Sequence, residues 1–150
     1  MTESELESFL QDHIPLARAM GVQVVSIAQD KVVLGAPLAP NINHHATVFG
    51  GSGATLATLA AWSLLHVRLK AAGLPSSEVI QNSTMDYLAP IAGDFTAAAT
   101  LDADADWDGF LRMLTRKGRA RIGIGAELMS GDTIGGRFHG TFAAFASDRA

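Results

Sequence analysis

A pair of histidines and a pair of glycines lie close together in the run N-I-N-H-H-A-T-V-F-G-G-S, residues 41–52. Histidine titrates near neutral pH, so His44 or His45 could act as a general base. Gly50 and Gly51 have no side chains, so they leave the nearby backbone N–H groups unshielded. If a helix begins at these glycines, its first N–H groups are free and carry a partial positive charge. A ligand oxygen could then bind at this point.

The same run also has a purely structural interpretation. A glycine pair before a helix is often only a turn that lets backbone segments pack closely. Either histidine could instead cap the loop or lie at a dimer interface, and Asn41 is expected to be a turn residue after Pro40. The many polar side chains favour the functional interpretation, because a loop carries such groups cheaply only at the surface or in a site.

The element that must position this run is a long apolar helix, predicted over Phe49–Ala72. The stretch Gly53–Val67 contains no Asp, Glu, Lys or Arg. A helix that is apolar on nearly every side is a buried helix. Arg68 and Lys70 fall in its last turns, and Gly73 is the expected stop.

The rest of the chain is predicted to form mainly strands. We expect helices over Ser4–Leu10, Ile14–Met20 and Asp106–Lys117, and strands over Val22–Ala28, Lys31–Ala36, Val79–Leu88, Phe95–Leu101, Arg119–Met129 and Thr133–Ala146. Most strand connections are tight, which favours an antiparallel sheet. A single apolar helix can be buried against such a sheet only if the sheet curls around it. The predicted fold class is therefore α+β, with an antiparallel sheet wrapped around a long central helix.

Length and composition limit the function classes. A chain of 150 residues is expected to form one domain, residues 1–150, and its net charge of −4 argues against nucleic-acid binding. The chain has no cysteine, which excludes a disulfide, a thiol nucleophile and a thiolate metal site. The acidic N-terminus lacks an apolar signal core, and the central apolar run is too short to span a bilayer. We expect a soluble, cytoplasmic protein without a metal site, since no carboxylate lies at ligand spacing from the histidines.

Three motifs carry a resemblance to a known family. They are T-x-F-G-G-S-x-A-T-L-A-x-L-A-x-W over Thr47–Trp62, Y-L-A-P over Tyr87–Pro90, and R-K-G-R-A-R over Arg116–Arg121. With the order of elements, they make nearly the whole chain similar to the hotdog-fold thioesterase superfamily. More narrowly, the chain resembles the thioesterase domain of the YiiD C-terminal type.

The resemblance implies hydrolysis of an acyl thioester carried on coenzyme A or on an acyl carrier protein, whose thiol arm is part of the substrate rather than a cofactor. In such enzymes the thioester carbonyl binds backbone N–H groups at the start of the central helix, here Gly50 and Gly51. Preorganised donors there stabilise the oxyanion that forms on attack. Many relatives carry a carboxylate at the position of Thr58, and a threonine cannot serve as a general base at neutral pH.

If the chain activates water, a side chain other than Thr58 must do so. The candidates are His44, His45 and Asp86, a carboxylate in an otherwise apolar strand that could act across a subunit boundary or merely pair with an arginine. The substrate contacts expected from the resemblance are Asn43, Phe49, Ser52, Tyr87, Arg116 and Arg119. The basic run around the last two could hold coenzyme A phosphates, or could simply be a solvated helix C-terminus.

Two further expectations concern function class and assembly. Without a helix carboxylate, the chain could be an acyl-thioester binder that does not hydrolyse its ligand. A hydratase or dehydratase on the same fold is a third, weaker alternative. Because a single sheet around one helix has open edges, we expect a homo-oligomer, either a dimer or a dimer of dimers.

Overall fold

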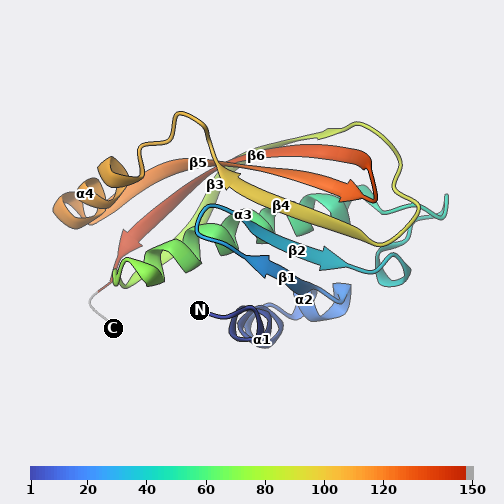
Figure 1. The fold of residues 1–150 in the computed structure, drawn as a ribbon, viewed down its shortest axis with the longest axis horizontal. Helices are drawn as coiled ribbons and strands as arrows, with labels where there is room; N and C mark the ends of the chain where they lie inside the picture. The colour runs from blue at the N-terminus through green and yellow to red at the C-terminus, as the bar shows by residue number, and fades with distance from the viewer. Residues whose placement is uncertain (148–150) are drawn as a thin grey trace.

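The computed structural model describes residues 1–147 and shows two layers, a sheet and the long helix that it encloses (Figure 1). The elements, in chain order, are α1 (Glu3–His13), α2 (Pro15–Met20), β1 (Gln23–Ile27), β2 (Val32–Ala36), the 3₁₀ turn η1 (Ala39–Asn41), α3 (Gly50–Ala71), β3 (Ser76–Tyr87), β4 (Phe95–Leu101), α4 (Trp107–Lys117), β5 (Arg119–Ser130) and β6 (Thr133–Ala146).

The strands form one six-stranded sheet in the order β1-β2-β4-β5-β6-β3. Every adjacent pair is antiparallel. The sheet curves around α3, which runs along its concave face (Figure 1). The predicted fold class is therefore confirmed.

The helix α3 supplies the centre of the hydrophobic core. Its side chains pack against inward-facing residues of the sheet such as Leu34, Phe95 and Phe142, all buried. Burying one large apolar side chain contributes about 1.5–3 kcal/mol, so this layer holds the sheet in its curved form. The alternation predicted for β5 is also confirmed, because Ile122, Ile124, Ala126 and Leu128 are all buried.

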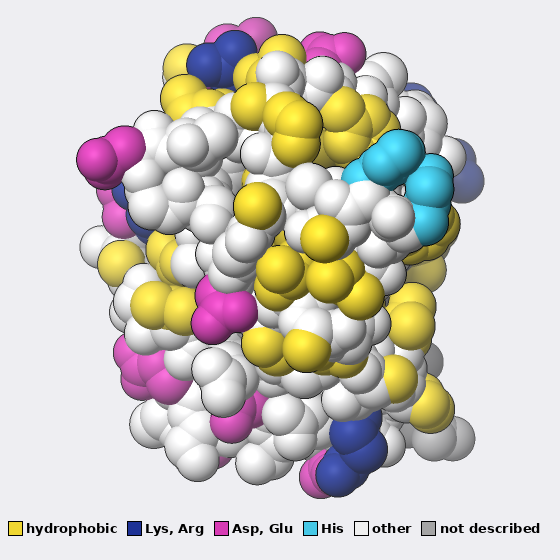
Figure 2. Space-filling model, turned by 90° about the vertical axis from the view of Figure 1, so that its right-hand side faces the viewer, with side chains coloured by type: hydrophobic (Ala, Val, Ile, Leu, Met, Phe, Trp, Pro, Cys, Tyr) yellow, Lys and Arg dark blue, Asp and Glu magenta, His cyan; other side chains and the backbone are white. Residues whose placement is uncertain are grey.

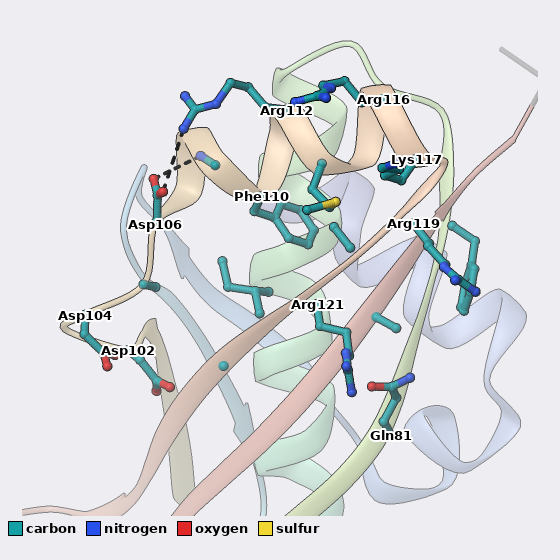
Figure 3. Close-up of a pocket in the computed structure, with 18 residues that line it drawn as sticks. Gln81, Asp102, Asp104, Asp106, Phe110, Arg112, Arg116, Lys117, Arg119 and Arg121 are labelled. Carbon is teal, nitrogen blue, oxygen red and sulfur yellow. Dashed lines mark hydrogen bonds and ion pairs between the residues drawn. The ribbon is translucent and has the colours of Figure 1, made fainter.

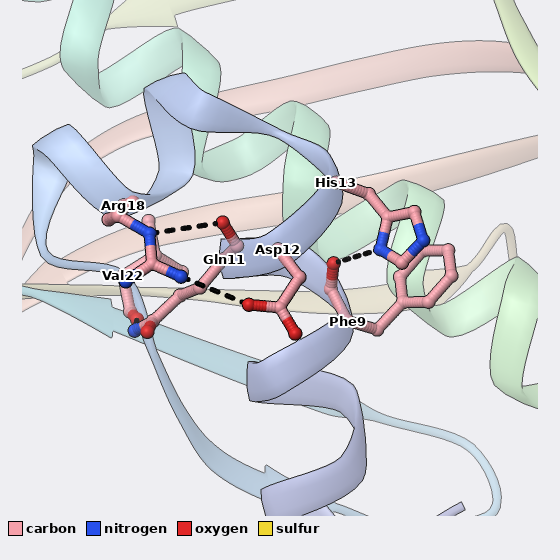
Figure 4. A network of polar contacts seen from close by, with 6 residues as sticks. All are labelled: Phe9, Gln11, Asp12, His13, Arg18 and Val22. Carbon is pink, nitrogen blue, oxygen red and sulfur yellow. Dashed lines mark hydrogen bonds and ion pairs between the residues drawn. The ribbon is translucent and has the colours of Figure 1, made fainter.

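The two N-terminal helices close the side of α3 next to β1. Thr2 and Glu5 form a capping box at the start of α1. Figure 4 shows the junction between α1 and α2, where Arg18 donates to a carboxylate oxygen of Asp12 at 3.0 Å. The amide of Gln11 donates to the backbone oxygen of Val22 at 3.0 Å, which ties α1 to the residue before β1 (Figure 4).

The far end of α3 positions α4. The guanidinium of Arg68 lies 4.4 Å from the ring centroid of Trp107, the first residue of α4, and donates to the backbone oxygen of Gln29 at 2.8 Å. Burial lowers the pKa of Arg68, while the nearby Asp30 raises it. Asp106 caps α4 by accepting from the Gly109 N–H at 2.9 Å.

Strand β3 differs from its prediction and forms one edge of the sheet. It begins at Ser76 rather than Val79, because the long β6 continues to Ala146 and supplies pairing partners. Its exposed side chains include Val79 at 46% and Ile80 at 39%. A long exposed edge strand with unpaired backbone groups is a surface on which another strand can pair. Within residues 1–147, no helix is long and apolar enough to cross a membrane.

Candidate active site

The first turn of α3 presents free backbone donors. Phe49 is the N-cap residue and gives no side-chain hydrogen bond to the helix. The first regular helical hydrogen bond is donated by the Gly53 N–H to the Phe49 oxygen, at 3.1 Å. Among residues 1–147, the N–H groups of Gly50, Gly51 and Ser52 have no acceptor. Such N–H groups, at the positive end of the helix dipole, can bind an oxygen that carries negative charge.

These donors adjoin an apolar pocket of about 370 Å³. The start of α3, the segment that follows β3, and the strands β5 and β6 all contribute to its wall. The lining residues are Thr47, Val48, Phe49, Gly50, Gly53, Tyr87, Leu88, Ala89, Pro90, Ile91, Leu128 and Gly135. Figure 2 shows this end of the molecule, where hydrophobic side chains gather next to histidines. The pocket can accept an apolar group whose polar end faces the helix.

The loop before α3 is organised by two asparagines. Asn43 accepts from the backbone N–H groups of His45 and Thr47 through Oδ1, at 2.9 and 3.1 Å, and its Nδ2 donates to the Thr47 hydroxyl at 3.0 Å. Asn41 ends the turn η1 and is only 2% exposed. Its Nδ2 donates to the backbone oxygen of Met20 at 2.9 Å, and its own backbone oxygen accepts the Phe49 N–H at 2.8 Å. Both side chains therefore fix the approach to the helix.

The glycines in the first turn permit close contacts. A Cβ on Gly50 would lie 3.3 Å from the ring of Tyr87, and a Cβ on Gly51 only 2.5 Å from the ring of Phe49. The Phe49 ring is 57% exposed and can turn away, whereas the Tyr87 ring is held by a hydrogen bond from its hydroxyl to the Gly50 oxygen at 2.9 Å. Gly50 lines the pocket directly, while the Phe49 ring lies over Gly51.

The candidate bases lie outside the pocket wall. His44 and His45 are exposed and in contact with each other, with ring centroids 3.9 Å apart. Asp86 is exposed near the end of β3, opposite Arg137, but Arg137 pairs with Glu127 at 3.2 Å. Among residues 1–147, no ion pair involves Asp86. No aspartate, glutamate or histidine is among the residues that line the pocket.

Thr58 lies on α3, seven residues after Gly51, and its side chain bonds to the backbone of the same helix. Its hydroxyl donates to the backbone oxygen of Ala54 at 2.8 Å. This bond is typical of a threonine inside a helix. Thr58 therefore supplies no charge at the position where the resemblance implied a carboxylate.

A second, larger cavity of about 1220 Å³ lies between α4 and the outer face of the sheet (Figure 3). Basic side chains come to it from both walls: Arg112, Arg116 and Lys117 from α4, and Arg119 and Arg121 from β5 (Figure 3). We call this cavity the basic groove. Asp106 lies beside Arg112, at 3.9 Å from its guanidinium, while Asp102 and Asp104 lie farther along the groove, where Asp102 contacts His139 Nε2 at 2.8 Å (Figure 3). A multiply charged anion would fit the basic end.

The basic groove and the apolar pocket lie at opposite ends of the molecule (Figure 1). The helix α3, with its 22 residues, is about 33 Å long at 1.5 Å per residue and separates them. The structure thus brings Phe49, Gly50 and Tyr87 together at one end, and Arg116 and Arg119 at the other.

Several residues of the pocket were not singled out from the sequence. Leu128 and Gly135 come from β5 and β6, and Val48 and Ile91 are joined by a hydrogen bond between the Val48 N–H and the Ile91 oxygen at 2.8 Å. The predicted inward alternation of β5 was the one signal that could have indicated Leu128. The others depend on contacts between distant segments.

Comparison with known proteins identifies relatives of the chain. The sequence profile of a family described as "Putative thioesterase (yiiD_Cterm)" matches residues 3–146. A crystal structure of a protein of unknown function from Chlorobaculum tepidum TLS is similar, with a TM-score of 0.89 and 28% identity, over 97% of this chain and 94% of that one.

Two solved structures with thioesterase names have the same fold. One is a putative thioesterase from Shewanella oneidensis, with a TM-score of 0.83 and 22% identity, over 95% of this chain and 96% of that one. The other is a thioesterase from Haemophilus influenzae, with a TM-score of 0.80 and 13% identity, over 99% of this chain and 94% of that one.

Proposed function

The chain belongs to the YiiD_C family of putative thioesterases and has the hotdog fold, and from this premise we propose that it hydrolyses acyl thioesters at the start of α3. The observation that carries the proposal is the set of free N–H groups at Gly50 and Gly51 beside an apolar pocket. The acyl chain enters the pocket, where Phe49 and Tyr87 form part of the wall. The carbonyl oxygen then binds the helix N-terminus.

The reaction follows from this placement. A water oxygen attacks the carbonyl carbon, and the electron pair of the C=O double bond moves to the oxygen. The N–H groups of Gly50 and Gly51 stabilise this oxyanion, while a base takes the proton of the attacking water. Collapse of the tetrahedral intermediate breaks the C–S bond, and the sulfur leaves as a thiol after it receives that proton. The products are a carboxylic acid and a free thiol.

We assign the role of general base to one of the exposed loop histidines, His44 or His45, in preference to Asp86. His44 and His45 belong to the same loop as the N-cap residue Phe49, which places them close along the chain to the proposed oxyanion donors. Asp86 is adjacent in sequence to Tyr87, but successive strand side chains point to opposite faces of a sheet. A chain that binds thioesters without hydrolysing them remains the alternative, and the bonded hydroxyl of Thr58 favours it.

The basic groove indicates the chemical class of the thiol that carries the acyl group. Coenzyme A carries several phosphate groups, and arginine binds phosphate through paired, charge-assisted hydrogen bonds. Arg116 on α4 and Arg119 on β5 both line the groove. We assign the phosphates of an acyl-coenzyme A to this groove, with Asn43 and Ser52 near the thioester end.

A dimer would bring the basic groove of one copy close to the apolar pocket of the other, although the two lie at opposite ends of a single copy. A two-fold axis at the free edge of β3 pairs this strand with its own copy in an antiparallel sense. The Tyr87 end of one β3 then lies beside the Ser76 end of the other, and Ser77 is in register with Phe145 at the basic groove. The groove of one copy can thus bind the phosphates of a ligand whose thioester lies at the α3 N-terminus of the other copy. Asp86 of each copy also comes near this boundary.

The assembly gives a first prediction. Light scattering and sedimentation should show a homodimer, or a dimer of dimers, at micromolar concentration, because the unpaired backbone of the edge strand β3 is covered by pairing with a second copy. Placing a lysine at the exposed Val79 and Ile80 together should shift the equilibrium toward the monomer. A wild-type protein that remains a monomer throughout this concentration range would contradict the prediction.

The groove gives a second prediction. The double variant Arg116→Glu/Arg119→Glu should raise the KM for an acyl-coenzyme A by roughly 10–100-fold, because charge-assisted contacts with phosphate are lost. The KM for the N-acetylcysteamine thioester of the same acyl group, which has no phosphate, should not change. Lys31→Glu/Lys70→Glu is the matched control, since both lysines are exposed and lie outside the groove. Equal effects on the two thioesters would show that the groove does not hold the phosphates.

The proposed function itself is tested by thiol release from a panel of acyl-coenzyme A and acyl carrier protein thioesters. The chain has no cysteine, so a thiol reagent reports only the product. Release of thiol from at least one thioester is the expected result. Binding of acyl-coenzyme A, measured by calorimetry, without any thiol release would instead identify a binding module.

A further inference from the structure

Tyr87 makes a contact that the reaction described above does not use. Its hydroxyl donates to the backbone oxygen of Gly50 at 2.9 Å, across 37 residues of chain. The ring lies so close to Gly50 that a Cβ at this position would be 3.3 Å from it. Tyr87 is the last residue of β3, so this bond joins the end of the sheet to the first turn of α3.

The accepting carbonyl and one of the proposed oxyanion donors belong to the same peptide unit. The C=O of Gly50 and the N–H of Gly51 are joined by a C–N bond with partial double-bond character. A hydrogen bond to this oxygen draws electron density from the nitrogen and makes the N–H a stronger donor. Such cooperative strengthening is about 10–30% per bond.

We propose that Tyr87 is a positioning residue that orients and polarises the Gly50–Gly51 peptide, so that the Gly51 N–H binds the thioester oxygen more strongly. This inference rests on the proposed function. Two adjacent glycines have wide conformational freedom, and this first turn has no side-chain cap. The hydroxyl of Tyr87 therefore adds a side-chain restraint to the backbone hydrogen bonds at the helix start, and its ring serves as a wall of the acyl pocket.

The test uses the fact that Tyr87 is the only tyrosine of the chain. Tyr87→Phe keeps the ring and removes the hydroxyl, and biosynthetic replacement of tyrosine by a fluorotyrosine changes this position alone and makes the hydroxyl a stronger donor. The amide proton and nitrogen shifts of Gly51 are measured by NMR without any substrate. Gly53, whose N–H donates to the Phe49 oxygen, is the internal reference.

We expect the Gly51 amide proton to move upfield in Tyr87→Phe and downfield in the fluorotyrosine protein, while the Gly53 shift stays within experimental error. In the same two proteins, kcat should fall roughly three- to tenfold for Tyr87→Phe and rise for fluorotyrosine, with KM unchanged. A role in holding the fold alone would not give opposite changes in two folded proteins.

Two results would overturn the inference. One is a Gly51 amide shift that responds to neither replacement. The other is an unchanged kcat in Tyr87→Phe, whether or not the amide shift responds. Failure of the proposed function is recognised separately, because wild-type protein would then release no thiol from any thioester, a result that does not depend on Tyr87.

Discussion

Replacing Gly51 by valine should lower the rate of thioester hydrolysis by roughly 10²–10³-fold, the usual cost of losing one oxyanion donor. The branched side chain would stand in the path of the carbonyl toward the first turn of α3. The protein should still fold, because valine has a higher helix propensity than glycine. Steady-state thiol release and the thermal unfolding midpoint together measure the two effects.

The control for this variant concerns Phe49, since a Cβ at position 51 would lie 2.5 Å from its ring. The exposed ring can move, and its displacement could by itself disturb the pocket. Phe49→Ala alone should therefore cost less activity than Gly51→Val, and the double variant should remain as slow as Gly51→Val. Recovery of activity in the double variant would mean that the ring, rather than the helix N-terminus, determines the rate.

Removing the base should lower the rate by about 10²–10⁴-fold, the usual contribution of general-base catalysis. We expect this loss from either His44→Ala or His45→Ala, with little effect from the other. Asp86→Asn preserves the shape of the side chain, removes its charge, and should remain active. Loss of activity in Asp86→Asn alone would transfer the role to Asp86, and full activity in all three variants would mean that none of these side chains activates water.

Thr58→Asp extends the same experiment. It places a carboxylate at the position where relatives are expected to carry one, and it removes the hydroxyl that donates to the Ala54 oxygen. If the pocket is otherwise complete, this variant should hydrolyse thioesters faster than the wild type. An unchanged or lower rate would show that position 58 does not face the bound thioester.

The fold could be predicted from the sequence because its signals are local and mutually consistent. The stretch Gly53–Val67, which has no charged residue, indicated the buried helix, and the alternation in Arg119–Met129 indicated a half-buried strand. The start of β3 was missed because residues 76–78 pair with the far end of β6, a contact between distant segments. Residues 75–77, P-S-S, are typical of a turn, so the sequence did not indicate that the strand begins there.

The site could be predicted only in part. The glycine pair at the helix start was identified, since glycine and helix signals are adjacent in sequence. The bond from Tyr87 to Gly50 spans 37 residues and gives no local signal. Likewise, the basic run near Arg116 was visible as a charge cluster, but its distance from the helix start depends on the whole sheet. The histidines were placed near the pocket by sequence proximity, whereas the loop turns their rings toward each other.

Infrared spectroscopy of a bound thioester tests most directly whether the start of α3 polarises the carbonyl. An acyl-coenzyme A with a ¹³C-labelled carbonyl is bound to the slowest base variant, and the carbonyl stretch is isolated by subtraction of the unlabelled complex. Two preorganised N–H donors should move this stretch below its frequency in water, and the shift should disappear when Gly51→Val is added. A bound thioester with the same carbonyl frequency as in water, in both proteins, would contradict the account.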